Sequence, residues 1–219
     1  YGGNAMINPR LKQAVMTDIV LLAQVGVKVV LVHGGGPEIS QMLSRLGLTS
    51  KFIDGLRCTD EESMQVVQMV LAGKTNKDLV SLIGVCGGKA IGLCGIDGRM
   101  IQAEKLKGRP ELGYVGEITK VDIAPILNAL ADGYIPVIAT VGVDAEGMAF
   151  NINADTAAAE IAAALGAENM IALTDIRGLM HDVGDEGSLI PVVKIDEVDA
   201  LIAGGKVSGG MIPKVRSCE

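Results

Sequence analysis

The most informative stretch of the sequence is VVLVHGGGPEIS, residues 29–40. Its apolar, β-branched beginning predicts a strand that is buried on both faces. Gly34, Gly35, Gly36 and Pro37 follow, and the sequence then continues with the apolar spacing of a helix. A helix that begins directly after a strand points backbone N–H groups toward the sheet edge where open α/β folds bind ligands. The stretch therefore predicts an anion-binding glycine loop, with a tight turn that needs a positive φ as the alternative.

The same alternation of strand and helix patterns continues along the chain. Helices are expected over residues 14–25, 38–48, 61–73, 76–88, 122–133, 154–167 and near 196–203, and strands over residues 27–33, 89–97, 134–143 and 168–176. Residues 97–120 interrupt this order and predict an antiparallel hairpin. The pattern predicts an α/β fold in which helices cover both faces of a mainly parallel sheet.

Composition excludes several classes of protein. The 219 residues carry a net charge of −7 with two Phe, three Tyr and no Trp, which argues against a nucleic-acid-binding surface. No apolar run reaches the roughly 18 residues that a membrane span needs. The four cysteines lack metal-binding spacing, so we expect reduced thiols, no metal site and a cytoplasmic location.

Both ends of the sequence carry glycines. YGG opens the chain without a preceding strand, and GGMIPKVRSCE begins a helix and stops, so we expect the domain to be truncated at both ends. No signal peptide is visible. If a strand leads into Gly2 and Gly3, these residues form a second glycine turn at the same sheet edge as Gly34, and the two turns would face each other across a phosphoryl group.

Three polar residues precede the alanine-rich helix of residues 154–167. Asn151, Asn153 and Asp155 alternate along an extended approach, which would place their side chains on one side. The simpler interpretation is that Asp155 is only the N-cap of that helix. The paired asparagines are harder to explain as capping residues.

Arg57 and Lys214 are candidate anion-binding residues. Arg57 lies in DGLRCTD, where a solvated loop arginine is the ordinary alternative. Lys214 lies in the first turn of a helix, where its charge is unfavourable unless an anion is near. The histidines are weak catalytic candidates: His33 is expected to be a hydrogen-bonded structural group and His181 a solvated one.

Two common nucleotide-binding motifs are absent. Residues 34–39 lack the dinucleotide pattern G-x-G-x-x-G, so a dinucleotide oxidoreductase is disfavoured. GKT at residues 73–75 imitates the end of a Walker loop, but Gln68 stands where the first glycine would be needed. We interpret AGKTNK, residues 72–77, as a helix end and a loop with solvated lysines.

Together these segments resemble the amino acid kinase family, and within it the kinases that act on N-acetyl-L-glutamate. The resemblance rests on YGG, VHGGGPEIS, DGLRCTD, FNINADTAAAEIA, ALTDIRGLM and GGMIPKV, in that order over nearly the whole chain. It implies a three-layer αβα sandwich with an acceptor-binding N-lobe, residues 1–166, and a nucleotide-binding C-lobe, residues 167–219. It also implies a catalytic lysine before the first glycine turn, at a position that the sequence does not include.

The resemblance assigns roles to residues of this sequence. It implies catalytic roles for Gly3, Gly35, Asp155 and Lys214, and acceptor-binding roles for Gly34, Gly35, Gly36, Arg57, Asn151 and Asn153. Residues implied at the nucleotide are Gly2, Gly3, Thr174, Asp175, Gly178, Gly209, Gly210, Met211 and Lys214.

The implied reaction is phosphorylation of the γ-carboxylate of N-acetyl-L-glutamate by ATP carrying Mg²⁺, a step of arginine biosynthesis. An ionised carboxylate needs no general base, which agrees with the lack of a convincing catalytic histidine. The resemblance further implies a homodimer or larger homo-oligomer and, in some relatives, a regulatory partner of the PII type. The alternatives are a kinase for a carrier-linked aminoadipate and a non-catalytic amino-acid or nucleotide sensor.

Overall fold

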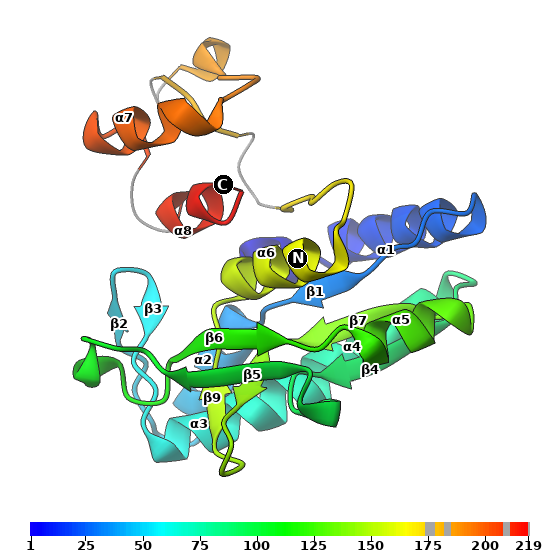
Figure 1. Ribbon diagram of the computed structural model, residues 1–219, viewed down its shortest axis with the longest axis horizontal. Helices are drawn as coiled ribbons and strands as arrows, with labels where there is room; N and C mark the ends of the chain where they lie inside the picture. The colour runs from blue at the N-terminus through cyan, green and yellow to red at the C-terminus, as the bar shows by residue number, and fades with distance from the viewer. Residues whose placement is uncertain (174–177, 182–184, 208–210, 219) are drawn as a thin grey trace.

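The computed structural model describes residues 1–173, 178–181, 185–207 and 211–218 (Figure 1). Its centre is a parallel sheet of three strands in the order β1 (Leu31–His33), β7 (Ile135–Ala139), β4 (Ala90–Cys94). After Thr140 the chain of β7 continues into β8 (Val141–Val143), which belongs to a four-stranded sheet. The order of that sheet is β6 (Gly116–Val121), β5 (Ile101–Lys105), β8, β9 (Ala149–Asn151).

Successive residues of the central strands point to opposite faces of the sheet and define two helical layers. Val32 and Ile138 pack with α5 (Ala124–Ala131) and α6 (Ala154–Leu165). Their neighbours Leu31 and Val137 pack with α1 (Pro9–Gln24) and α4 (Asn76–Val85). On this second face, Ala139 and Val141 pack with α2 (Gly36–Arg45) and α3 (Glu61–Gln68). The predicted three-layer arrangement around a mainly parallel sheet is confirmed.

The expected antiparallel hairpin is also present. Strands β5 and β6 pair antiparallel from Ile101 opposite Val121 to Lys105 opposite Gly116, with a bulge between Gln102 and Ala103. A smaller hairpin, β2 (Phe52–Ile53) and β3 (Leu56–Arg57), carries Arg57. Short 3₁₀ turns complete this part of the chain: η1 (Gly3–Met6), η3 (Asp97–Arg99) and η4 (Pro110–Leu112).

Helix α1 begins five residues before the expected start. The side chain of Asn8 accepts hydrogen bonds from the backbone N–H groups of Arg10, at 3.0 Å, and Leu11, at 3.3 Å. Pro9 occupies the first helical position, where its missing N–H group costs nothing. The capping residue therefore sets the start of the helix, and not the first apolar repeat.

The loop expected at residues 72–77 is wrong. Helix α3 runs without a break through a π-helical segment, η2 (Met69–Thr75), into α4. A side chain at Gly73 would meet no atom within 4 Å, so this glycine marks no turn or close contact. The π-helical segment joins the apolar face of α3 to that of α4 without a break, so the helix continues where the sequence suggested an end.

The C-terminal part has a small core of its own. It contains η5 (Glu186–Ser188), η6 (Ile195–Glu197), α7 (Val198–Ala203) and α8 (Met211–Arg216). Val198, Val207 and Val215 form its buried centre, and α8 lies between α7 and α6 (Figure 1).

The strand expected over residues 168–176 is wrong for the described part, residues 168–173. These residues pair with no strand, and Ile171 is 72% exposed. A strand needs a partner for its backbone hydrogen bonds, and none of the described strands pairs with this segment. Among the described residues no helix is both long and apolar enough to cross a membrane.

Two glycines give a matched test of this packing. A β-carbon at Gly95, just after β4, would collide with the backbone oxygen of Val141 and lie 2.7 Å from Cδ1 of Ile101. Gly95→Ala should lower the free energy of unfolding by about 2 kcal/mol. In Gly84→Ala, within α4, the new methyl group meets no atom within 4 Å, so stability should rise by about 0.5–1 kcal/mol. Urea unfolding measures both, and equal effects would contradict the packing described.

Candidate active site

A cavity of about 290 Å³ opens where the glycine loops meet the start of α6. Its volume lies near the lower end of the roughly 300–1,000 Å³ range of small-molecule sites. The sequence-predicted residues that line it are Gly2, Gly3, Gly34, Gly35, Gly36, Arg57, Asn151, Asn153, Asp155 and Lys214. Residues from almost the whole length of the chain therefore converge on one space.

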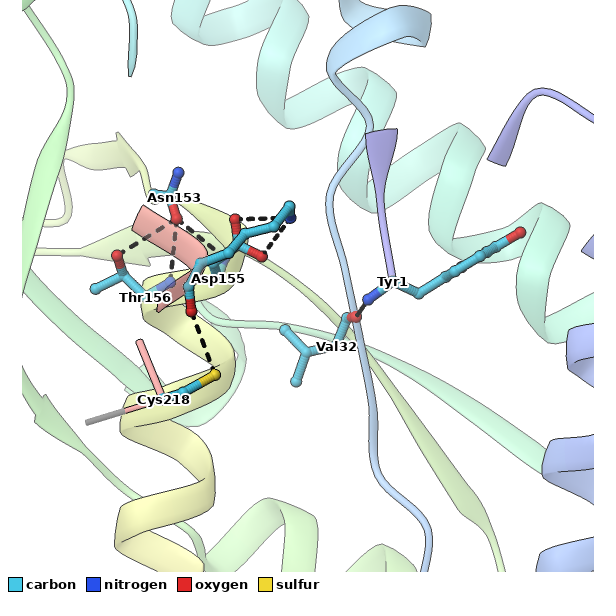
Figure 2. A network of polar contacts seen from close by, with 7 residues as sticks. Tyr1, Val32, Asn153, Asp155, Thr156 and Cys218 are labelled. Atoms are coloured by element: carbon cyan, nitrogen blue, oxygen red, sulfur yellow. Dashed lines mark hydrogen bonds and ion pairs between the residues drawn. The ribbon is translucent and has the colours of Figure 1, made fainter. Parts of the chain in front are cut away.

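The two glycine segments lie side by side at one sheet edge, as the sequence predicts. The backbone nitrogen of Tyr1 donates to the carbonyl oxygen of Val32 at 2.8 Å (Figure 2). The N–H of Gly34 in turn donates to the carbonyl oxygen of Tyr1 at 3.0 Å. This parallel pairing brings Gly2 and Gly3 against the loop that follows β1.

Gly34 and Gly35 are needed for close approach, and none of the three loop glycines has a left-handed φ. Gly34, Gly35 and Gly36 are not among the glycines with positive φ, so the tight-turn alternative is wrong. A β-carbon at Gly35 would lie 2.8 Å from Cδ2 of Leu71, and one at Gly34 would lie 3.2 Å from Cβ of Ala154. The loop backbone is thus pressed between η2 and the start of α6.

The loop also supplies hydrogen-bond donors. Helix α2 begins at Gly36, and its first turn is closed by the N–H of Ile39, which donates to the carbonyl of Gly35 at 2.9 Å. The N–H groups of Gly35 and Gly36 precede that bond, so the helix provides no acceptor for them. Such groups at a helix N-terminus favour an anion.

Arg57 is buried and not a solvated loop residue. Arg57 is 6% exposed, and its guanidinium carbon lies 4.6 Å from the centroid of the Phe52 ring. The Nη2 atom donates to the Gly36 carbonyl and to Ser40 Oγ, each at 2.8 Å, and Nη1 donates to Ser50 Oγ at 2.6 Å. All these partners are neutral, and no carboxylate among the described residues pairs with it.

Burial lowers the pKa of the Arg57 guanidinium from its ordinary value, because desolvation disfavours the charged form. An arginine still keeps its charge in a protein. The cavity wall therefore carries a largely buried positive charge that Gly36, Ser40 and Ser50 hold in place without neutralising it.

Asn153, and not Asp155, caps α6. Its Oδ1 atom accepts from the backbone N–H groups of Asp155, at 3.0 Å, and Thr156, at 3.1 Å (Figure 2). The interpretation of Asp155 as a simple N-cap is wrong, because the preceding asparagine already fills that position. The Asp155 carboxylate is instead paired with Lys214, whose Nζ lies 2.8 Å from Oδ1 and 3.0 Å from Oδ2.

Asn151 is tied to the same wall as Arg57. Its Nδ2 donates to Thr59 Oγ1 at 3.0 Å, and that hydroxyl donates to the carbonyl of Arg57 at 2.8 Å. Thr59 is 1% exposed. The asparagine at the end of β9 is thereby fixed relative to the β2–β3 hairpin.

The remaining candidate residues either lie away from the cavity or fall outside the described residues. Gly178 and Met211 are described but do not line the cavity, and Met211 packs against the C-terminal core. Thr174, Asp175, Gly209 and Gly210 lie outside the described residues. No group of three histidine, cysteine or acidic side chains among the described residues is placed to hold a metal ion.

Sequence reasoning missed the residues that support the site. Ser40 and Ser50 hold Arg57, Thr59 holds Asn151, and Thr140 lies buried in the cavity wall. Small hydroxyl residues are common in every protein, so no sequence pattern distinguishes these. Their importance depends on contacts between segments distant in the sequence.

His33 is a buried structural group, as expected. It is fully buried, and its Nδ1 lies 2.8 Å from the carbonyl oxygen of Gly34. Burial is the main cause that lowers its pKa to about 4. The hydrogen bond to the Gly34 carbonyl acts in the opposite direction, and the positive charges of the amino terminus, Lys12 and Lys77 lower the pKa by smaller amounts. His181 is exposed. The site therefore contains no histidine placed to act as a general base at neutral pH.

Comparison with known proteins agrees with this architecture. The sequence profile described as the amino acid kinase family matches residues 1–219. The chain belongs to the amino acid kinase family. All 219 residues are thus accounted for by one family, and the glycine loops at the carboxyl ends of its strands are parts of a single kinase fold.

Relatives within this family are closely similar. Over 218 residues, the chain is 57% identical to the acetylglutamate kinase of Actinobacillus pleuropneumoniae serotype 3 and 53% identical to that of Brachyspira hyodysenteriae. Each match covers 100% of this chain and 76% of the relative. The crystal structure of smu.665 from Streptococcus mutans has a TM-score of 0.88 at 29% identity, covering 99% of this chain and 85% of that one.

The lowered pKa of His33 makes stability depend on pH. In the unfolded chain a histidine takes up its proton near pH 6.5, whereas the folded protein resists protonation to about pH 4. The stabilisation is complete above pH 6.5 and is lost as the pH falls toward 4. From pH 7 to pH 5 the free energy of unfolding should fall by about 2 kcal/mol through this group. Urea unfolding should show that fall in the wild type and in His181→Asn but not in His33→Asn.

Proposed function

We propose that the protein phosphorylates the γ-carboxylate of N-acetyl-L-glutamate with ATP, giving N-acetyl-L-glutamyl 5-phosphate for arginine biosynthesis. The observation that carries the proposal is identity of 53–57% over the whole chain to proteins named acetylglutamate kinase. The cavity supports it chemically, because its polar groups suit two anions.

The reaction needs no proton transfer. A γ-carboxylate oxygen forms a bond to the γ-phosphorus of ATP, and the bond from that phosphorus to the β,γ-bridging oxygen breaks, leaving ADP. The electron pair of the broken bond stays on ADP. Catalysis is therefore a matter of aligning two anions and stabilising the charge that develops on the transferring group.

Acceptor binding is assigned to the wall that contains Arg57. Its buried charge has neutral partners only among the described residues, so an incoming α-carboxylate would be the first anion to pair with it. Asn151 and Asn153 line the same cavity and offer amide groups. This arrangement favours a free, small dicarboxylate over a carboxylate presented on a carrier protein.

The phosphoryl group is assigned to the opposite side of the cavity. The N–H groups of Gly3 and Gly35 would donate to its oxygens, and Lys214 would neutralise part of its charge. Gly34 and Gly36 would lie toward the acceptor, because the Gly36 carbonyl is bonded to Arg57. Asp155 holds Nζ of Lys214 through both of its oxygens, so it positions the cation. ATP supplies the phosphoryl group and carries Mg²⁺ with it. Gly2 and the stretch containing Thr174, Asp175, Gly178, Gly209, Gly210 and Met211 would lie nearer the nucleotide.

The two-lobe division is part of the proposal. Residues 1–166 would bind the acceptor and residues 167–219 the nucleotide, which the separate core around Val198, Val207 and Val215 supports. A cytoplasmic location is supported by the four cysteines, all of them free thiols. A homodimer or larger homo-oligomer is supported by exposed apolar side chains on α1, including Leu11 and Leu21. The PII-type partner rests on the family resemblance alone.

Trapping of the acyl phosphate tests the function. The full-length protein is incubated with MgATP, hydroxylamine and either N-acetyl-L-glutamate or free L-glutamate. Hydroxamate should form with the acetylated acceptor and be much less abundant with free glutamate. Absence of hydroxamate from N-acetyl-L-glutamate, with ATP still bound, would refute the proposal and favour another acceptor or a sensor.

Lys214→Ala should lower kcat by about 100-fold and change KM for N-acetyl-L-glutamate little, because the charge acts mainly on the transition state. Steady-state kinetics of the hydroxamate assay measures both constants. Lys194→Ala, which removes an exposed lysine from the same part of the chain, is the control. An unchanged kcat in the Lys214 variant would remove this residue from the mechanism.

Arg57→Ala should raise KM for N-acetyl-L-glutamate at least tenfold and leave KM for ATP nearly unchanged, because its charge faces the acceptor. Arg57→Lys keeps the charge but not the forked hydrogen bonds, so it should recover part of the affinity. Arg45→Ala, in exposed sequence at the end of α2, is the control. Equal losses of affinity for both substrates would contradict the assignment of Arg57 to the acceptor side of the site.

A further inference from the structure

A network of hydrogen bonds between buried polar groups lies beneath the glycine loop. His33 is fully buried and Asn76 is 1% exposed. The Nδ2 atom of Asn76 lies 2.8 Å from the carbonyl oxygen of Val137, 3.3 Å from that of Leu93 and 3.2 Å from Nε2 of His33. On the other side of the ring, Nδ1 lies 2.8 Å from the carbonyl oxygen of Gly34. This network thus connects β7 and β4 to the first loop glycine.

The surrounding groups determine the direction of each hydrogen bond in this network. Lys77 Nζ, which can only donate, lies 3.0 Å from Asn76 Oδ1. The carbonyl groups of Val137 and Leu93 can only accept, so they face the amide nitrogen. The Nδ2 group of Asn76 has two hydrogens shared among three acceptors and cannot itself accept, so His33 Nε2 can only be an acceptor toward it. The Gly34 carbonyl beside Nδ1 can also only accept, so the proton of the neutral ring must be on Nδ1. His33 then donates to the carbonyl oxygen of Gly34.

That last bond controls a peptide plane. The C=O of Gly34 and the N–H of Gly35 belong to one planar, trans peptide unit and point in opposite directions. When His33 holds the carbonyl toward the buried side, the Gly35 N–H is turned away from it. Gly34 and Gly35 both line the cavity.

We propose that His33, held in its Nδ1–H tautomer by Asn76, is a positioning residue that aims the Gly35 N–H at the transferring phosphoryl group. The histidine touches neither substrate. It acts through the Gly34–Gly35 peptide, which glycine flexibility would otherwise leave free to rotate. This inference rests on the proposed function, because it concerns the same phosphoryl site.

The surrounding packing is built to accommodate this network. A β-carbon at Gly92, in β4, would collide with Oδ1 of Asn76 and Nζ of Lys77, so the strand leaves room for both groups. Leu71 and Thr75 of η2 flank Gly35, where a β-carbon would lie 2.8 Å from Cδ2 of Leu71 and 3.4 Å from Oγ1 of Thr75. The Thr75 hydroxyl is buried without a hydrogen-bond partner among the described residues. The π-helical segment thus places Thr75 against the loop and leads directly into Asn76.

The tautomer is tested first, on the wild-type protein. The sequence contains two histidines, so ¹⁵N NMR with His181→Gln for assignment isolates His33. The expected signature is a protonated Nδ1 and an unprotonated Nε2 throughout pH 5.5–8.5. A protonated Nε2 would overturn the proposal, whatever reaction the protein catalyses.

A pair of substitutions then separates positioning from packing. The amide nitrogen of an asparagine reaches about where Nδ1 of a histidine lies, whereas that of a glutamine reaches about where Nε2 lies. His33→Asn can still donate to the Gly34 carbonyl and should keep kcat within about threefold of the wild type. His33→Gln cannot, and its kcat should fall at least tenfold with little change in either KM.

Thermal unfolding of both variants provides the control for stability. The proposal expects the two kcat values to differ even where the melting temperatures of the variants are alike. Equal kcat values, or values that follow melting temperature alone, would overturn it. Failure of the proposed function has another signature, because the wild-type protein would then form no hydroxamate from N-acetyl-L-glutamate while the His33 tautomer stayed as expected.

Discussion

The close approach of the Gly34 and Gly35 backbone to two helical segments positions the other groups of the site. A β-carbon at Gly35 would lie 2.8 Å from Cδ2 of Leu71 in η2, and one at Gly34 would lie 3.2 Å from Cβ of Ala154 in α6. This packing brings the N-termini of α2 and α6 to the same cavity. Both helix ends favour negative charge, so the fold itself creates an anion site before any charged side chain is considered.

Electrostatics then divides the cavity into two parts. The protein has a net charge of −7, yet the wall at Arg57 carries a buried positive charge with neutral hydrogen-bond partners. Lys214 is different, because Asp155 partly neutralises and orients it. A dicarboxylate suits the first environment, and a phosphoryl group, with its own metal-bound charge, suits the second.

Much of this could be predicted from the sequence, since the decisive signals are local. The triple glycine after a β-branched run predicted the loop, and the alternation of patterns predicted the layers. Other features depend on contacts between distant segments. Gly73 was interpreted as a helix end because glycine commonly follows the last turn of a helix. The structure shows that it lies inside a continuous helical segment, with no atom within 4 Å of an added β-carbon. Asp155 resembled an N-cap until Asn153 was seen to occupy that role. Arg57 was predicted to bind an anion, but its burial could not be predicted, because Ser40 and Ser50, which hold it, lie in other parts of the chain.

We propose that Arg57 binds the acceptor, while Gly35 and Lys214 bind the phosphoryl group. A crystal structure of the full-length protein with N-acetyl-L-glutamate, MgADP and aluminium fluoride, a mimic of the transferring group, would locate both. We expect the α-carboxylate on the Arg57 guanidinium and the fluoride within hydrogen-bonding distance of the Gly35 N–H and Lys214 Nζ. A fluoride complex on the Arg57 side, or an acceptor away from Arg57, would contradict it.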